Sequence, residues 1–103
     1  MGLRAFARFV GNSGVIIGNA MNIASIVRNA VGQYTITMVA NTCATDTYCV
    51  LLSSEGAGPN RVGLAYQVTS ATIFVMNAVT LMTPTQNPIF SDPTSISFLV
   101  VQL

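Results

Sequence analysis

Apolar and polar positions alternate over most of the chain, and this period of two predicts short β-strands. In the first run, "LRAFARFV" at 3–10, the odd-numbered residues face one side and the other side carries Arg4, Phe6, Arg8 and Val10. Both sides include apolar residues, so we expect protein contacts on both sides of this strand. The "GNSG" that follows at 11–14 predicts a turn or bulge, because Gly and Asn tolerate positive φ.

A second pattern, at 26–40, predicts a β-hairpin. Its sequence is "IVRNAVGQYTITMVA", in which Asn29 and Gly32 are residue types that short hairpin loops use. We therefore expect a loop at 28–33 between two antiparallel strands. After the loop, one side of the strand carries Tyr34, Ile36 and Met38, and the other side carries Thr35, Thr37 and Val39. Shorter apolar runs at 15–18 and 21–27 precede the hairpin.

Further strand-like runs fill the rest of the sequence. They lie at 47–54, 62–69, 72–79 and 94–103, and polar, Gly-rich or Pro-rich stretches separate them at 41–46, 55–60 and 83–93. About seven or eight short strands with such turns are typical of an antiparallel β-sandwich, and a closed barrel would give the same pattern. We predict a single all-β sandwich domain over residues 1–103, with a barrel as the alternative.

Charged side chains are unusually scarce. The chain has four Arg and three acidic residues and no Lys or His: Arg4, Arg8, Arg28, Arg61, Asp46, Glu55 and Asp92. In soluble domains about a quarter of the residues are charged, so a free monomer of this composition would tend to associate. We expect the protein to work within an assembly. The net charge of +1 is also too small for a nucleic-acid-binding face, which needs clustered basic residues, so no nucleic-acid partner is expected.

The longest uncharged stretch, 62–91, does not predict a transmembrane helix. Polar residues interrupt it at Gln67, Thr69, Ser70, Thr72 and Asn77, and prolines end it at Pro84 and Pro88. A spanning helix needs about 20 mostly apolar residues. We therefore expect no membrane insertion.

The residues needed for catalysis are largely missing. Without His, the commonest general base is absent, and a Ser-His-Asp or Cys-His arrangement within one chain is excluded. The acids Asp46, Glu55 and Asp92 fall in three separate predicted loops, where we expect solvated or capping carboxylates. A pair of them acting across loops or between subunits is the alternative. We expect no enzymatic activity and no cofactor.

Cys43 and Cys49 are the only cysteines. Zinc takes four nitrogen or sulfur ligands, so two thiols without His do not predict a metal site. A disulfide would be compatible with an oxidising compartment. We favour two small, half-buried thiols in a protein that assembles in a reducing cytoplasm.

Arginines supply the first group of candidate contact residues. Arg is enriched at protein interfaces, although a solvated arginine that keeps the chain in solution is the equal alternative. Arg4 and Arg8 share a strand face with Phe6, and Asn12 lies in the adjoining turn. Arg28 and Arg61 lie at predicted loop edges.

Aromatic residues supply the second group. Phe90 lies beside Asp92 in the Pro-rich loop, and we regard this pair as a candidate ligand-facing site. Tyr48 and Tyr66 lie within predicted strands, so we expect them to pack in the core or across strands.

Four stretches together resemble one known family. They are "AFARFVGNSG", "GNAMNIASIVRNAVGQYTITMVANTCATDTYCVLL", "TIFVMNAV" and "DPTSISFLVVQL". Their order and spacing resemble the C-terminal knob domain of tailed-phage fibres and related virion proteins, over essentially the whole chain. The matching elements fall on Phe6 and Phe9 and on 22–29, 32–36, 48–50, 74–77 and 92–100. The chain departs from the family at Ala30, where Gly is frequent, and at its last residues, "VVQL", which lack the usual Gly-ended strand.

The resemblance implies a jelly-roll or H-type-lectin-like β-sandwich that forms a homotrimer and serves a virion by binding. Fibre knobs follow long shaft and attachment segments, and this sequence starts only a few residues before its first strand. We therefore expect a capsid decoration or cement protein, made in the host cytoplasm and bound to the major capsid protein on the outer surface of the virion. The contact candidates are Arg4, Phe6, Arg8, Asn12, Arg28 and Arg61. The alternative is a tail-fibre or tail-tip module that binds a host surface glycan, and a free lectin is the third reading.

Overall fold

The computed structural model describes residues 2–55, 61–81 and 89–102. These residues form eight β-strands and no helix, which confirms the predicted all-β class. The strands are β1 (Gly2–Val10), β2 (Ile23–Ala30), β3 (Gln33–Met38), β4 (Tyr48–Glu55), β5 (Arg61–Val68), β6 (Ile73–Leu81), β7 (Ile89–Phe90) and β8 (Ser95–Gln102). The predicted loop at 55–60 lies outside the described residues except for Glu55, as does most of the loop at 83–93.

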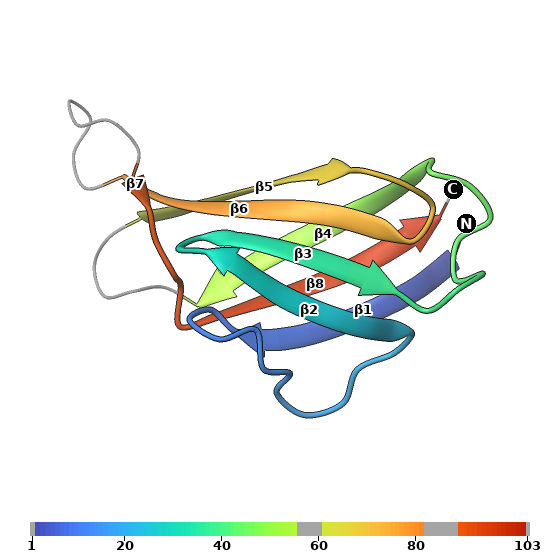
Figure 1. The fold of residues 1–103 in the computed structure, drawn as a ribbon, viewed down its shortest axis with the longest axis horizontal. Helices are drawn as coiled ribbons and strands as arrows, with labels where there is room; N and C mark the ends of the chain where they lie inside the picture. The colour runs from blue at the N-terminus through green and yellow to red at the C-terminus, as the bar shows by residue number, and fades with distance from the viewer. Residues whose placement is uncertain (1, 56–60, 82–88, 103) are drawn as a thin grey trace.

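The strands form two antiparallel sheets, which Figure 1 shows as two layers. One sheet has the order β1-β8-β4, and the other has the order β2-β3-β6-β5 with the short β7 paired to β6. In the described residues no strand of one sheet pairs with a strand of the other, and the two isolated bridges, Phe6 to Met21 and Phe9 to Ile16, join β1 to the segment between β1 and β2. The arrangement is therefore a sandwich-like pair of sheets, not one closed barrel.

The core lies between the two sheets and follows the predicted alternation. Its centre is lined by Ala5, Ala7, Phe9, Tyr34, Ile36, Met38, Phe74, Met76, Ala78, Ile96, Phe98 and Val100, all buried. Edge-to-face ring contacts join one sheet to the other, with ring centroids 5.1 Å apart for Phe9 and Tyr34 and 5.5 Å apart for Phe74 and Phe98. Such pairs stabilise by about 0.5–1.5 kcal/mol beyond the burial of their area.

The predicted hairpin is present, with longer strands than expected. β2 and β3 pair antiparallel as far as Ala30 and Gln33, so the turn is only Val31 and Gly32. Gly32 has φ +67°, and a Cβ there would lie 2.4 Å from the carbonyl oxygen of Ala78. Glycine is needed at this position both for its backbone conformation and for the close approach of β6.

The apolar run at 15–18 does not form the regular strand that its composition suggests. Gly14 and Gly18 have φ of +78° and +70°, which interrupts an extended backbone. The segment 15–21 instead makes scattered backbone hydrogen bonds to β1, such as Ile17 N–H to the Arg8 carbonyl (2.7 Å). It thereby covers the edge of β1 that β8 does not use, and an edge covered in this way is protected from pairing with another chain.

Candidate functional site

The outer side of the β1-β8-β4 sheet carries an unusual row of large apolar residues. The register places Phe6 opposite Leu99 and Leu99 opposite Leu51, so one row crosses all three strands. The adjacent row contains Leu3, Val101 and Cys49. Their sequence neighbours on β4 and β8 point into the core, so these side chains point outward. We call the six residues of these two rows the apolar face.

The apolar face is exposed where a sandwich would normally present polar side chains. Leu51 is 57% exposed, Leu3 48% and Leu99 43%. Antiparallel sheets in two-layer folds usually have one side in the core and one polar side in solvent. A contiguous exposed apolar surface on a small protein marks a contact with another molecule.

A shallow hollow of about 480 Å³ lies over this sheet. Its lining includes Phe6, Leu51 and Leu99 from the apolar face, and Asn19 from the segment that covers the edge of β1. Exposed leucines of the apolar face thus form part of the wall of this depression.

Arg8 borders the apolar face and is paired within the chain. Its Nη2 lies 2.6 Å from Oε2 of Glu55, and its Nε donates a hydrogen bond to the Ser95 hydroxyl (3.2 Å). Both charged side chains are about half exposed, and solvent-exposed ion pairs stabilise proteins little. The electrostatic consequence is local: the positive charge of Arg8 is neutralised at the border of the apolar face.

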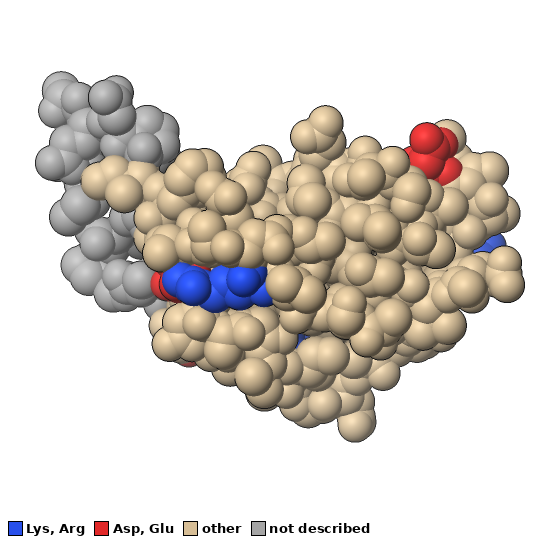
Figure 2. All heavy atoms as spheres, in the orientation of Figure 1, with Lys and Arg blue, Asp and Glu red and all other residues tan. Residues whose placement is uncertain are grey.

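Charged residues are also scarce on the side of the molecule that Figure 2 shows, where only small blue and red areas interrupt the tan surface.

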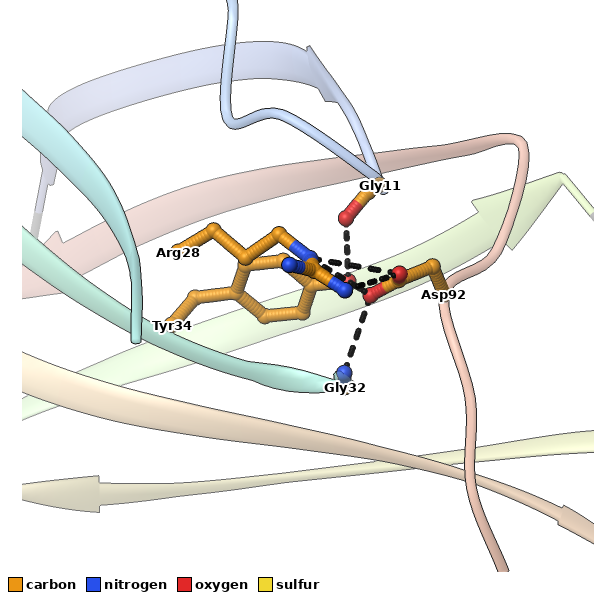
Figure 3. A network of polar contacts seen from close by, with 5 residues as sticks. All are labelled: Gly11, Arg28, Gly32, Tyr34 and Asp92. Atoms are coloured by element: carbon orange, nitrogen blue, oxygen red, sulfur yellow. Dashed lines mark hydrogen bonds and ion pairs between the residues drawn. The ribbon is translucent and has the colours of Figure 1, made fainter. Parts of the chain in front are cut away.

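A second polar cluster closes one end of the sandwich (Figure 3). Arg28 Nη2 lies 2.6 Å from Asp92 Oδ2, and Arg28 Nε lies 3.2 Å from both carboxylate oxygens. The Gly32 N–H donates to Asp92 Oδ1 at 2.9 Å. The Tyr34 hydroxyl lies 3.0 Å from the same oxygen and 2.7 Å from the Gly11 carbonyl oxygen. The cluster thus ties the β2–β3 hairpin to the turn after β1 and to the segment before β8.

The protonation states of this cluster are fixed by its geometry. Burial alone would raise the pKa of Asp92, but hydrogen bonds from Arg28, Gly32 and Tyr34 and the charge of Arg28 bring it below its usual value. Burial and the hydrogen bond to Asp92 raise the pKa of Tyr34. At neutral pH the pair is a carboxylate and a neutral phenol, which suits a structural role and not proton transfer. Of the two expected roles, solvated or capping carboxylate, Asp92 has the capping one, because it accepts the Gly32 N–H and its side chain is only 16% exposed.

The structure separates Arg4 from the other candidates on its strand. A register shift between Leu3 and Ala5 marks a β-bulge at Arg4. Phe6 and Arg8 line the hollow over the sheet, whereas Arg4 lines a different hollow of about 290 Å³ with Asn22 and Asn41. The expected single face of Arg4, Phe6 and Arg8 is therefore interrupted by the bulge.

The remaining candidates lie apart from one another. Asn12 is exposed in the turn after β1, and Arg61 is the first residue of β5. Arg28 lies within β2 and not at a loop edge. Phe90 lies in β7 opposite Val79 and is 46% exposed, so its ligand-facing role stays a prediction, while the carboxylate of Asp92 is occupied within the chain.

The two tyrosines differ in environment. Tyr48 is buried, as expected, and burial raises its pKa to about 12. Tyr66 lies opposite Met76 on the edge strand β5 and is 38% exposed, which makes it a cross-strand residue.

Sequence reasoning missed two of the three exposed leucines of the apolar face, Leu51 and Leu99. The available signal was the same two-sided apolar pattern that was recognised in the first strand: "CVLLS" and "SFLVV" also carry apolar residues at both phases of the alternation. An apolar residue at the solvent-facing positions of the alternation was the sign of an exposed apolar surface.

The described residues offer no further chemical site. Within 2–55, 61–81 and 89–102, no three His, Cys, Asp or Glu residues are placed to hold a metal ion. None of the secondary structure in these ranges is a helix long and apolar enough to cross a membrane. The resemblance to phage fibre knobs stays a prediction. No family model, no curated protein and no solved structure matches this chain.

Proposed function

We propose that this protein is a non-enzymatic structural component that works by association with other protein. The observation that carries the proposal is the apolar face, whose leucines are exposed although nothing in the architecture of a two-layer sandwich requires it. A protein of this size gains little from exposed leucines unless another molecule covers them.

The charged residues support the same reading. Of the four Arg and three acidic residues, Arg8 and Glu55 form one ion pair and Arg28 and Asp92 form another. These pairs leave few charged groups to bind a charged substrate or to transfer protons. Association through apolar surface is then the function that the remaining surface serves best.

The biological setting of the proposal is a virion, and this part rests on the resemblance of the sequence to phage fibre knobs. We propose a trimeric capsid decoration or cement protein that contacts the major capsid protein on the outer surface of the particle. A tail-fibre knob is the second candidate, favoured by the exposed Phe90 on β7, which would suit contact with a host surface glycan.

The number of copies per particle tests this proposal. Quantitative mass spectrometry of purified particles of a phage that encodes the protein should find hundreds of copies per particle if it decorates the capsid. A few copies, or a few dozen, would instead assign it to the tail. Its absence from particles would refute the virion role.

A further inference from the structure

We infer that the apolar face is covered by a further copy of this chain. The inference rests on the proposed function and names the partner for its contact surface. In the proposed trimer, the three copies turn their β1-β8-β4 sheets toward a common axis.

Charge is the first argument for a second copy. The two rows of the apolar face contain no charged residue, and on their border Arg8 is already paired with Glu55. A strongly charged partner would find no complementary charge here. Arg4, the exposed bulge residue beside Leu3, lines a different hollow, so a copy of the same chain brings two rows that are equally free of charge.

Shape is the second argument. Sheets that pack face to face lie about 10 Å apart with interdigitating side chains, so projections on one side must meet depressions on the other. The apolar face offers both, because the exposed side chains of Leu51 and Leu99 form part of the wall of the hollow of about 480 Å³. Around a threefold axis the contact between neighbours is heterologous, so the depression of one copy can receive the exposed leucines of the next.

Area is the third argument. A stable interface buries about 800 Å² on each partner, roughly a seventh of the 5756 Å² that this chain exposes. The apolar face is continued at the edge of β1 by the segment 15–21, in which Val15, Ile16 and Ile17 are exposed. Exposed apolar residues therefore extend from the sheet to the segment at its edge.

A charge placed in the centre of this surface tests the inference. Leu51→Glu introduces a carboxylate at a position that is already exposed in the single chain, so the fold should tolerate it. Val27→Glu is the matched control, since Val27 is similarly exposed (51%) and lies on β2, opposite Thr35, on the outer side of the other sheet. In analytical ultracentrifugation, we expect Leu51→Glu to raise the dissociation constant of the oligomer at least about tenfold and Val27→Glu to leave it unchanged.

The two native thiols provide an independent measurement. Both are free, with Cys49 on the apolar face and Cys43 buried in the core, where burial raises the pKa of its thiol. A water-soluble thiol reagent should modify Cys49 slowly in the assembled parent and several times faster in Leu51→Glu. Cys43 should stay unreactive in both, which also shows that the variant is folded.

Other outcomes would overturn the inference in distinguishable ways. If the parent is an oligomer and Leu51→Glu changes neither its dissociation nor the reactivity of Cys49, the copies meet elsewhere and the virion role is untouched. The same holds if Val27→Glu dissociates the oligomer equally well. A monomeric parent with a reactive Cys49 would also exclude a second copy, and the copy number in particles would then decide separately whether the proposed function stands.

Discussion

At the scale of single residues, Asp92 is the group through which the stability of the fold should depend on pH. Its carboxylate accepts hydrogen bonds from Arg28, Gly32 and Tyr34, and these lower its pKa although burial opposes them. A carboxyl group with a lower pKa in the folded state binds protons more tightly in the unfolded chain. Asp92 therefore stabilises the fold above about pH 4, the usual pKa of an unfolded Asp, and this stabilisation is lost as the pH falls from there through the lower pKa of the folded protein.

We predict that Asp92→Asn lowers the free energy of unfolding at neutral pH by about 1–3 kcal/mol, because an amide leaves the buried hydrogen-bonding groups of the cluster imperfectly paired. In the parent, the free energy of unfolding should fall below about pH 4 as Asp92 is protonated, and this part of the fall should be absent from the variant. Urea unfolding over a pH series measures both effects. Tyr34→Phe is the control, since it removes the hydroxyl contacts with Gly11 and Asp92 but keeps the titrating carboxylate. The same pH dependence in the parent and in Asp92→Asn would contradict the prediction.

At the scale of elements, the β2–β3 hairpin depends on how closely it approaches β6. Gly32 accepts a hydrogen bond from Ala78 N–H at its carbonyl oxygen (2.8 Å), and Ser91 N–H donates to the Ala78 carbonyl oxygen (3.1 Å). A Cβ at Gly32 would lie 2.4 Å from that carbonyl oxygen and 2.9 Å from Ser91 N. The hairpin, β6 and the segment before β8 therefore meet at a point with no room for a side chain.

We predict that Gly32→Ala destabilises the protein by more than Gly18→Ala. Both glycines have positive φ, so both variants carry the backbone strain of about 1 kcal/mol or more. Only Gly32 adds a collision with backbone atoms, because nothing lies within 4 Å of a Cβ at Gly18. Denaturant midpoints of the two variants and the parent measure the difference. Equal losses would mean that β6 can move away from the turn at little cost.

The strands also show how far the sequence could predict the structure. The period of two identified the core side of β3, with Tyr34, Ile36 and Met38, because burial follows the alternation directly. It could not identify the bulge at Arg4 or the irregular segment 15–21, since both depend on backbone angles that the apolar pattern does not encode.

The polar cluster around Asp92 could not be predicted from the sequence, for a different reason. Arg28 and Tyr34 lie 64 and 58 positions from Asp92, and only the packing of the two sheets brings them together. The apolar face was partly visible as apolar residues at both phases of the alternation. The sequence pattern alone does not say which of two apolar sides becomes the core, so Leu51 and Leu99 could not be assigned to the surface without the structure.

At the scale of the whole molecule, the driving force for association must come mainly from apolar surface. Two ion pairs within the chain, Arg8 with Glu55 and Arg28 with Asp92, use four of the seven charged side chains. Hydrophobic association is strengthened by sulfate, which is excluded from protein surfaces, whereas dilute NaCl mainly screens interactions between charges. The response to salt therefore distinguishes contact through the apolar face from contact through the arginines.

We predict that the purified chain sediments as a trimer at micromolar concentration and that its dissociation constant changes less than about threefold between about 0.05 and 0.5 M NaCl. Added sodium sulfate should lower the dissociation constant, because it favours burial of the apolar face. Arg8→Ala should have little effect in any of these buffers, since the pair that it forms with Glu55 is about half exposed. A trimer that dissociates many-fold more readily in NaCl would instead assign the contact to charges, with Arg4 and Arg61 as the arginines to replace next. That result would restore the arginines to the role expected from the sequence and would leave the exposed leucines of the apolar face without a partner.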